Sequence, residues 1–217
     1  MVDLIVIGAG PAGYETAISA AEKGLKVILI EKHELGGTCL NQGCIPTKTL
    51  LYASELLSID EYAKLGLSGH VQLDLKKLHE YKATVIEKLR QGIATQLKKS
   101  GVELIKGSAK IVGEHQVAVN GELLEAKNIL LAAGSQPVMP KFFPQLKNVM
   151  TSDELLMYDQ AISHLVIIGG GVIGMEFASI YHGLGSKVTV IEAQDQLLPS
   201  MDKEIALKLK VLMKQRG

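Results

Sequence analysis

The chain has 217 residues, of which 47% are apolar, and its formal net charge is zero because 23 basic residues balance 23 acidic ones. This length is enough for one large or two small domains with a sizeable core. The balanced charge argues against a surface that binds nucleic acid or anionic membrane, and no apolar run is long enough to span a bilayer.

The first apolar stretch carries an acid and lacks the basic leader of a signal peptide, so we interpret it as a buried strand and expect a cytoplasmic protein. The pattern that begins there is typical of a strand, a glycine turn, a helix and a second strand. In chain order these are residues 4–7, the glycines Gly8, Gly10 and Gly13, residues 14–23 and residues 26–30, with Glu31 at the end.

The middle of the chain predicts two helices and four strands: helices over 45–57 and 74–99, then strands over 102–105, 109–112, 116–119 and 125–134. The last strand is apolar and ends in small residues, so we expect it to be buried. Pro137, Pro140 and Pro144 then indicate a linker. We place a domain boundary there, with domains over residues 1–145 and 146–217.

The last part of the chain repeats the first. A strand over 165–168 enters a glycine turn, a helix continues to His182, and a strand over 187–191 follows. The two segments align without a gap at seven matched positions: Gly8, Gly10, Gly13, Glu15, Gly24, Val27 and Glu31 correspond to Gly169, Gly171, Gly174, Glu176, Gly185, Val188 and Glu192.

Each repeat carries a dinucleotide-binding fingerprint. The first glycine permits the tight turn, the second lets the backbone approach a diphosphate, and the third lets the helix pack against the strand. The start of the helix then presents N–H groups to the phosphates. The acid at the end of the next strand can accept ribose hydroxyls and repels a 2′-phosphate, so Glu192 favours NAD over NADP. The remaining alternative is two α/β units without a ligand.

The only two cysteines, Cys39 and Cys44, have four residues between them and glycines beside them. That spacing lets one thiol reach the other around a tight loop. Because a disulfide in a reducing compartment is more often catalytic than structural, a redox-active disulfide is the leading hypothesis. The alternative is half of a zinc site, but no CxxC motif or paired histidines supply the other ligands, so we predict no metal.

The segment over residues 36–48, with both cysteines, Pro46 and Lys48, resembles the signature of the flavin-dependent pyridine nucleotide-disulfide oxidoreductases. Within that family the chain is most similar to the dihydrolipoyl dehydrogenases, and the resemblance covers its whole length. It implies an α/β fold of the FAD/NAD(P)-binding, Rossmann-like three-layer type. That fold has two dinucleotide-binding units, of which the second is incomplete in this sequence.

The resemblance also implies where two cofactors, FAD and NAD, bind. FAD is expected at the first fingerprint, the cysteine segment and two later points: Gly8, Gly10, Pro11, Ala12, Gly13, Glu31, Lys32, Gly36, Gly37, Thr38, Cys39, Lys48, Gly107, Ala133, Gly134 and Ser135. NAD is expected at the second fingerprint: Gly169, Gly171, Val172, Ile173, Gly174, Glu176 and Glu192.

The catalytic roles implied by the resemblance form an electron relay. Cys39 exchanges with the substrate disulfide, and Cys44 is the thiol nearer the flavin. Lys48 lies near the flavin and pairs with Glu176. The alternative is that Lys48 is an exposed side chain and that Glu176 only favours the start of its helix. Electrons would pass from dihydrolipoamide to the Cys39–Cys44 disulfide, then to FAD and then to NAD.

The implied partners are dihydrolipoamide, carried on a 2-oxoacid dehydrogenase or glycine cleavage complex, and a second copy in a homodimer. Glutathione reductase and mercuric reductase are alternatives that usually use NADP, so Glu192 argues against them. The family also has later segments and a catalytic histidine followed by proline, which none of the six histidines matches. We therefore expect the N-terminal portion of a longer enzyme, or a non-catalytic FAD-binding fragment. We expect no NAD reduction with dihydrolipoamide by these 217 residues alone.

Overall fold

The computed structural model describes all residues except 58–64, 67, 70, 142 and 144–145. These residues form two compact units. The first unit comprises Met1–Pro46 and Ala83–Asp153, and the second comprises Thr47–Lys82 and Glu154–Gly217. The boundary predicted between residues 145 and 146 adjoins residues outside the described part of the chain, and it stays a prediction.

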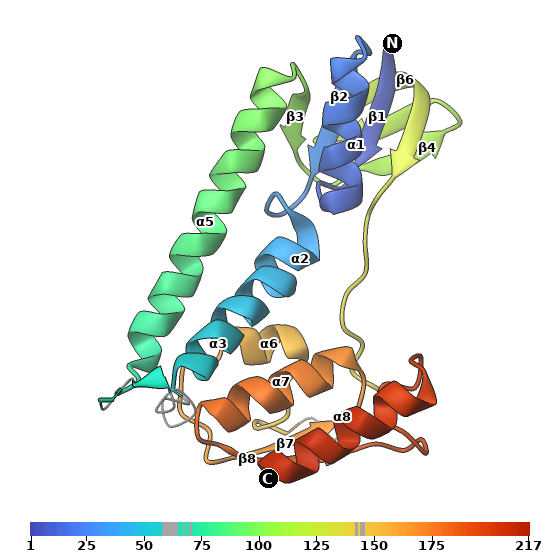
Figure 1. The fold of residues 1–217 in the computed structure, drawn as a ribbon. Helices are drawn as coiled ribbons and strands as arrows, with labels where there is room; N and C mark the ends of the chain where they lie inside the picture. The colour runs from blue at the N-terminus through green and yellow to red at the C-terminus, as the bar shows by residue number, and fades with distance from the viewer. Residues whose placement is uncertain (58–64, 67, 70, 142, 144–145) are drawn as a thin grey trace. The chain divides into compact units, whose positions relative to one another are not determined.

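The first unit is built on a six-stranded sheet with the order β3-β2-β1-β6-β5-β4 (Figure 1). The strands are β1 (Val2–Ile7), β2 (Val27–Glu31), β3 (Glu103–Lys106), β4 (Lys110–Gly113), β5 (Gln116–Val119) and β6 (Glu122–Leu131). Strands β3, β2, β1 and β6 run parallel, and β4, β5 and β6 form an antiparallel meander. The carboxyl ends of β1, β2 and β6 therefore meet at one edge, where such sheets bind ligands.

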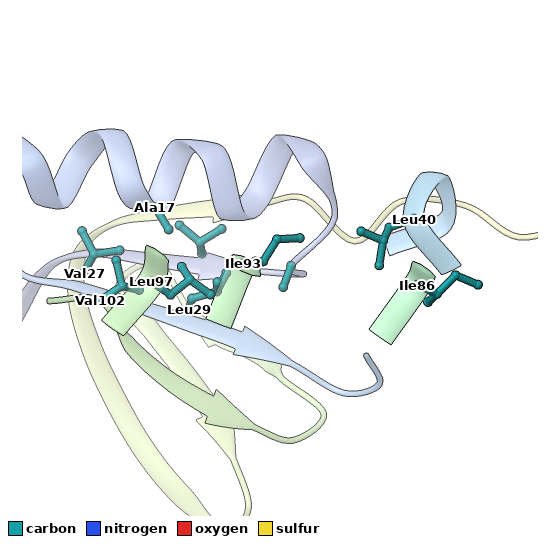
Figure 2. Close-up of a cluster of buried hydrophobic side chains, with 10 residues drawn as sticks. Ala17, Val27, Leu29, Leu40, Ile86, Ile93, Leu97 and Val102 are labelled. Carbon is teal, nitrogen blue, oxygen red and sulfur yellow. The ribbon is translucent and has the colours of Figure 1, made fainter. Parts of the chain in front are cut away.

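Helices cover one face of this sheet. Helix α1 (Pro11–Glu22) contacts β1 and β2, and α5 (Leu75–Lys99) contributes its residues from Ala83 onward to this unit. Figure 2 shows the resulting core, in which Ala17 of α1 and Ile93 and Leu97 of α5 surround Val27 and Leu29 of β2. Burial of these apolar side chains is the main force that holds the helices on the sheet.

The meander covers the opposite face. Val117 and Val119 of β5 are buried against Ile5 of β1 and Ile28 and Ile30 of β2. Residues that alternate along β1 and β2 thus point into two different clusters, as the two-residue period of a strand requires. The first unit therefore has three layers, and the predicted α/β, FAD/NAD(P)-binding, Rossmann-like fold class is confirmed.

The second unit contains a β-α-β element like that of the first. Strand β7 (His164–Ile168) leads into α7 (Val172–Gly183), which returns the chain to β8 (Lys187–Ile191), parallel to β7. Helix α7 buries Phe177, Ile180 and Tyr181, and burial raises the pKa of Tyr181 to about 12. The described part of this unit also contains α3 (Cys44–Leu56, from Thr47 onward), the start of α5 up to Lys82, α6 (Ser152–Met157, from Glu154 onward) and α8 (Lys203–Arg216).

The predicted strands and helices are present, mostly within one or two residues of the expected ends, but the strand predicted over 125–134 differs. It is β6, which ends at Leu131, and it is not buried as predicted. Within the predicted range, Ala126 is fully buried, whereas Leu131 is 64% exposed. Leu130 packs against the cluster that contains Ala17 of α1 and Ile93 of α5. Leu131, the next residue in the strand, points to the opposite face, where it is exposed.

Candidate functional site

The first glycine turn joins β1 to α1, and its geometry requires glycine at two points. Gly8 has φ of +102°, and a Cβ added there would lie 2.3 Å from the carbonyl oxygen of Ala132. A Cβ on Gly13 would lie 1.8 Å from the carbonyl oxygen of Gly8. Gly13 is therefore the point where α1 packs directly against the end of β1.

The start of α1 suits a diphosphate. Gly10 precedes the helix in an extended conformation, no side chain caps the helix, and its first turn has no acidic residue. The exposed residues Pro11 and Ala12 form the first turn. A Cβ on Gly10 would meet only the Cα of Gly37, at 3.7 Å. Among the described residues, no side chain caps the N–H groups at the positive dipole end of this helix, which fits a bound phosphate group.

Glu31 lies at the end of β2, beside the glycine turn. Its Oε2 accepts a hydrogen bond from the backbone N–H of Ala9 at 2.6 Å, and its Oε1 accepts one from His33 at 2.7 Å. The next residue, Lys32, is exposed. A carboxylate oxygen can accept more than one hydrogen bond, so Glu31 retains capacity for ribose hydroxyls while it holds the turn.

The second glycine turn joins β7 to α7 and has the same backbone form. Gly169 has φ of +106°, and a Cβ on Gly174 would lie 2.3 Å from the carbonyl oxygen of Gly169. A Cβ on Gly171 would have no atom within 4 Å, and no side chain caps the helix there. Val172 and Ile173 follow and are 48% and 60% exposed. This surface likewise fits a dinucleotide.

Glu192 has the position in the second unit that Glu31 has in the first. Its Oε2 accepts a hydrogen bond from the N–H of Gly170 at 2.6 Å, and its Oε1 accepts one from Gln194 at 2.8 Å. The bonds from Gln194 and Gly170 hold the pKa of this carboxyl below its usual value. The carboxylate is therefore fixed at the end of β8 in its charged form near neutral pH.

The cysteine segment is more helical than predicted. Instead of one tight loop, Gly37–Gln42 form the short helix α2, Gly43 interrupts it, and α3 begins at Cys44. A Cβ on Gly43 would lie 3.1 Å from the Cα of Cys39, so the residue before Cys44 packs against Cys39. Both are thiols in the structure; Cys39 is partly buried and Cys44 is exposed.

The cysteine segment lies directly against the first glycine turn. The N–H of Gly36 donates to the carbonyl oxygen of Ala9 at 2.8 Å. A Cβ on Gly37 would lie 2.6 Å from the Cα of Gly10, so only glycine allows this approach. Thr38 is exposed beside them. The structure thus brings together two sets of residues that the sequence places about 30 positions apart.

Lys48 and Glu176 form an ion pair within the second unit, between Nζ of Lys48 on α3 and Oε1 of Glu176 on α7. The pairing implied by the family resemblance is therefore present. The two side chains are 54% and 32% exposed, so water screens the pair and its contribution to stability is small, about 0–1 kcal/mol. A role of Lys48 at the flavin stays a prediction.

The other predicted cofactor residues follow strands β3 and β6. The N–H of Gly107 donates to the carbonyl oxygen of Glu31 at 2.9 Å, and a Cβ on Gly107 would lie 2.4 Å from Oδ1 of Asn120. Ala133, Gly134 and Ser135 follow β6 and are exposed. A hydrogen bond from Nε of Arg90 to Oδ1 of Asn41, at 2.7 Å, connects α5 to the cysteine segment. The sequence pattern does not indicate this contact, because the two positions are 49 apart.

Within the described part of the chain, no group of three or more His, Cys, Asp or Glu side chains could hold a metal ion. No described helix has both the length and the apolar character needed to cross a membrane.

Comparison with known proteins places these features in a family. Residues 2–217 match the model of the pyridine nucleotide-disulphide oxidoreductases. The chain is 44% identical to a dihydrolipoyl dehydrogenase of Thermus scotoductus and 40% identical to one of Bacillus subtilis, over 99% of its own length. It covers 47% and 49% of those proteins, so it spans about half the length of these relatives.

Solved structures give the same result. The chain matches the HOCl-induced flavoprotein disulfide reductase RclA from Escherichia coli with a TM-score of 0.85 and 32% identity. The match covers 99% of this chain and 47% of that one. The chain therefore belongs to the pyridine nucleotide-disulphide oxidoreductases, a family that binds FAD and NAD(P).

Proposed function

We propose that this chain serves a dihydrolipoyl dehydrogenase-like oxidoreductase, in which electrons pass from dihydrolipoamide through Cys39 and Cys44 to FAD and then to NAD. The observation that carries the proposal is the contact between the cysteine segment and the first glycine turn, at Gly36–Ala9 and Gly37–Gly10. Because of that contact, the residues that face a diphosphate adjoin the helix that carries Cys39. The similarity to dihydrolipoyl dehydrogenases supports the choice of substrate.

Each unit contributes one dinucleotide site in this proposal. In the first unit, the N–H groups at the start of α1 hold the diphosphate of FAD, and Glu31 accepts its ribose hydroxyls. Gly107 and the exposed residues after β6 let the cofactor approach the backbone. In the second unit, α7 and Glu192 hold NAD in the same way. The charge of Glu192 repels a 2′-phosphate, which favours NAD over NADP.

The chemistry assigned to the side chains is a thiol–disulfide exchange. Bound FAD supplies a two-electron carrier between the cysteines and the nicotinamide. Dihydrolipoamide loses two electrons and two protons and becomes a disulfide, while the Cys39–Cys44 disulfide gains them and becomes two thiols. Cys39 exchanges with the substrate. Lys48, held by Glu176, supplies a positive charge for the reduced cofactor.

The partners follow from the proposed substrate. Dihydrolipoamide is carried on a 2-oxoacid dehydrogenase or glycine cleavage complex, and the enzyme acts as a homodimer. The alternative of a glutathione or mercuric reductase-like enzyme is disfavoured. Such enzymes usually bind NADP through a basic residue, whereas an acid, Glu192, lies at the end of β8 beside the second glycine turn.

The test separates the two cofactor sites by the same substitution in each. Gly10→Asp and Gly171→Asp add a negative charge where a diphosphate would lie, and neither Cβ has a protein atom closer than 3.7 Å. We expect Gly10→Asp to abolish FAD binding, measured by flavin absorbance after reconstitution, and to leave NAD binding intact by calorimetry. Gly171→Asp gives the reverse result, so each variant is the control for the other.

The substrate is tested on the same protein. Chain reconstituted with FAD and oxidised at the cysteines is mixed with one equivalent of dihydrolipoamide. We expect the disulfide to be reduced in wild type, measured by alkylation and mass spectrometry. Cys39→Ser cannot form this disulfide, so it is the background control and is expected to give the same alkylation with and without dihydrolipoamide. Loss of FAD binding in Gly171→Asp but not in Gly10→Asp, or an inert disulfide in wild type, contradicts the proposal.

A further inference from the structure

Asn41 lies between the two cysteines and ties the ends of α2 together. Its side-chain amide donates one hydrogen bond to the carbonyl oxygen of Leu35 at 2.9 Å and another to that of Gly37 at 2.8 Å. Both amide hydrogens are therefore used, and they join the residues before α2 to the helix itself. The side chain spans the part of the segment that contacts the first glycine turn.

Arg90 of α5 fixes the orientation of that amide. Its Nε donates to Oδ1 of Asn41 at 2.7 Å, so the acceptor end of the amide is also used. Arg90 is 28% exposed, and its guanidinium lies 3.8 Å from Oε2 of Glu34 and 3.6 Å from Oε2 of Glu87. A hydrogen bond from a charged, partly buried donor is stronger than one between neutral groups. With three hydrogen bonds, the Asn41 amide has one orientation.

The consequence for the thiols follows from the packing. A Cβ on Gly43 would lie 2.9 Å from the carbonyl oxygen of Thr38 and 3.1 Å from the Cα of Cys39, so the residue before Cys44 packs against the turn that carries Cys39. The other end of α2 is held at Gly37, against Gly10. Cys39 lies inside this held helix and Cys44 follows two residues after its end. Restricting α2 therefore narrows the range of separations between the two thiols, and proximity raises their effective concentration for reaction with each other.

We propose that Asn41, oriented by Arg90, is a positioning residue that holds Cys39 and Cys44 for disulfide formation. This inference rests on the proposed redox function of the two cysteines. In the step that it affects, the two thiols lose two electrons and two protons as one S–S bond forms. Glutathione disulfide accepts them, and its S–S bond breaks to give two molecules of glutathione.

The test measures the equilibrium constant of that reaction in the 217-residue chain, in buffers with graded ratios of glutathione and glutathione disulfide. The oxidised fraction is counted by mass spectrometry after alkylation. We expect Arg90→Met, which removes one of the three hydrogen bonds of Asn41, to lower the constant about fivefold. Asn41→Ala removes all three and is expected to lower it at least as much. Arg90→Lys, which keeps a charged donor, is expected to recover part of the loss.

Glu87→Gln is the matched control, because it removes a carboxylate partner of Arg90 and leaves the bond to Asn41 in place. We expect it to match wild type. Arg90→Met keeps the Asn41 side chain and the backbone unchanged, so it carries the test if Asn41→Ala does not fold. Urea unfolding of each variant separates a loss of stability from a change in the redox equilibrium.

The outcomes distinguish this inference from the proposed function. If folded Asn41→Ala and Arg90→Met form the disulfide with the same equilibrium constant as wild type, the positioning role is overturned. The proposed function then still stands. Wild type that forms no Cys39–Cys44 disulfide at any glutathione ratio overturns both. A fall in the constant for Glu87→Gln equal to that for Arg90→Met also overturns the role, because charge on α5 would then be the cause.

Discussion

The first glycine turn lies between two neighbouring strands, whereas the second has one neighbouring strand in the described residues. At the first, the carbonyl oxygen of Ala132, just after β6, is 2.3 Å from the place of a Cβ on Gly8. At the second, a Cβ on Gly169 would have no atom within 4 Å. Despite this difference, the two turns have φ values of +102° and +106° at these glycines.

The hydrogen bonds of the two turns agree equally well. Glu31 and Glu192 each accept a bond of 2.6 Å from the turn, at Ala9 and Gly170. The N–H groups of Gly8 and Gly169 also donate, each at 2.8 Å, to the carbonyl oxygen of the residue before the glutamate. These acceptors are Ile30 and Ile191. The turn geometry is therefore set by the local glycine and glutamate pattern, and the neighbouring strand adds a steric constraint to a conformation that forms without it.

The largest expected difference between the turns is at their first glycine. Alanine at Gly169 meets only the strain of positive φ, about 1–2 kcal/mol. Alanine at Gly8 meets the same strain and also a backbone oxygen that cannot move aside, about 1–3 kcal/mol more. We expect Gly8→Ala to lower the free energy of unfolding more than Gly169→Ala, measured in urea with hydrogen exchange at β1 and β7. Equal losses would mean that the β6 contact adds nothing.

A smaller difference is expected at the third glycine, where both turns are crowded. A Cβ would lie 1.8 Å from an oxygen at Gly13 and 2.3 Å from one at Gly174. We expect Gly13→Ala to cost about 3 kcal/mol and Gly174→Ala about 2 kcal/mol by the same measurement. The control is Gly92→Ala in α5. Apart from its neighbours in the helix, a Cβ added there would have no atom within 4 Å, and alanine is more favourable than glycine in a helix by about 0.5–1 kcal/mol. A neutral Gly13→Ala would contradict the packing argument.

These turns and their strands are the part of the molecule that the sequence predicts well, because each forms from residues close together in the chain. The spacing of Gly8, Gly10 and Gly13 and the acid at Glu31 are enough to place a strand, a turn and a helix start. The exposure of β6 could not be predicted, because an apolar strand does not reveal which of its faces another element covers.

The candidate site was only partly predictable for the same reason. Helix α2 is six residues long, too short for a helical period to be visible around Cys39. The bond from Arg90 to Asn41 joins positions 49 apart, and that from Lys48 to Glu176 joins positions 128 apart. Composition and periodicity contain no signal for such contacts. The second was reached only through the resemblance to a family, and the first only through the structure.

The smallest expected effect concerns the glutamate of the second turn and is seen in its titration. The pKa of Glu192 is lowered by the backbone bonds from Gln194 and Gly170, so the ionised form is favoured in the folded state. Its contribution to stability is complete above the unfolded pKa of 4.5 and is lost as the pH falls through the lower folded pKa.

We expect the amide proton shift of Gly170, followed by NMR, to titrate with a midpoint below 4.5. Glu192→Gln should abolish this titration, and Glu31→Gln should leave it unchanged because Glu31 bonds to Ala9 in the other unit. A midpoint at or above the ordinary value would show that the carboxylate does not hold the turn.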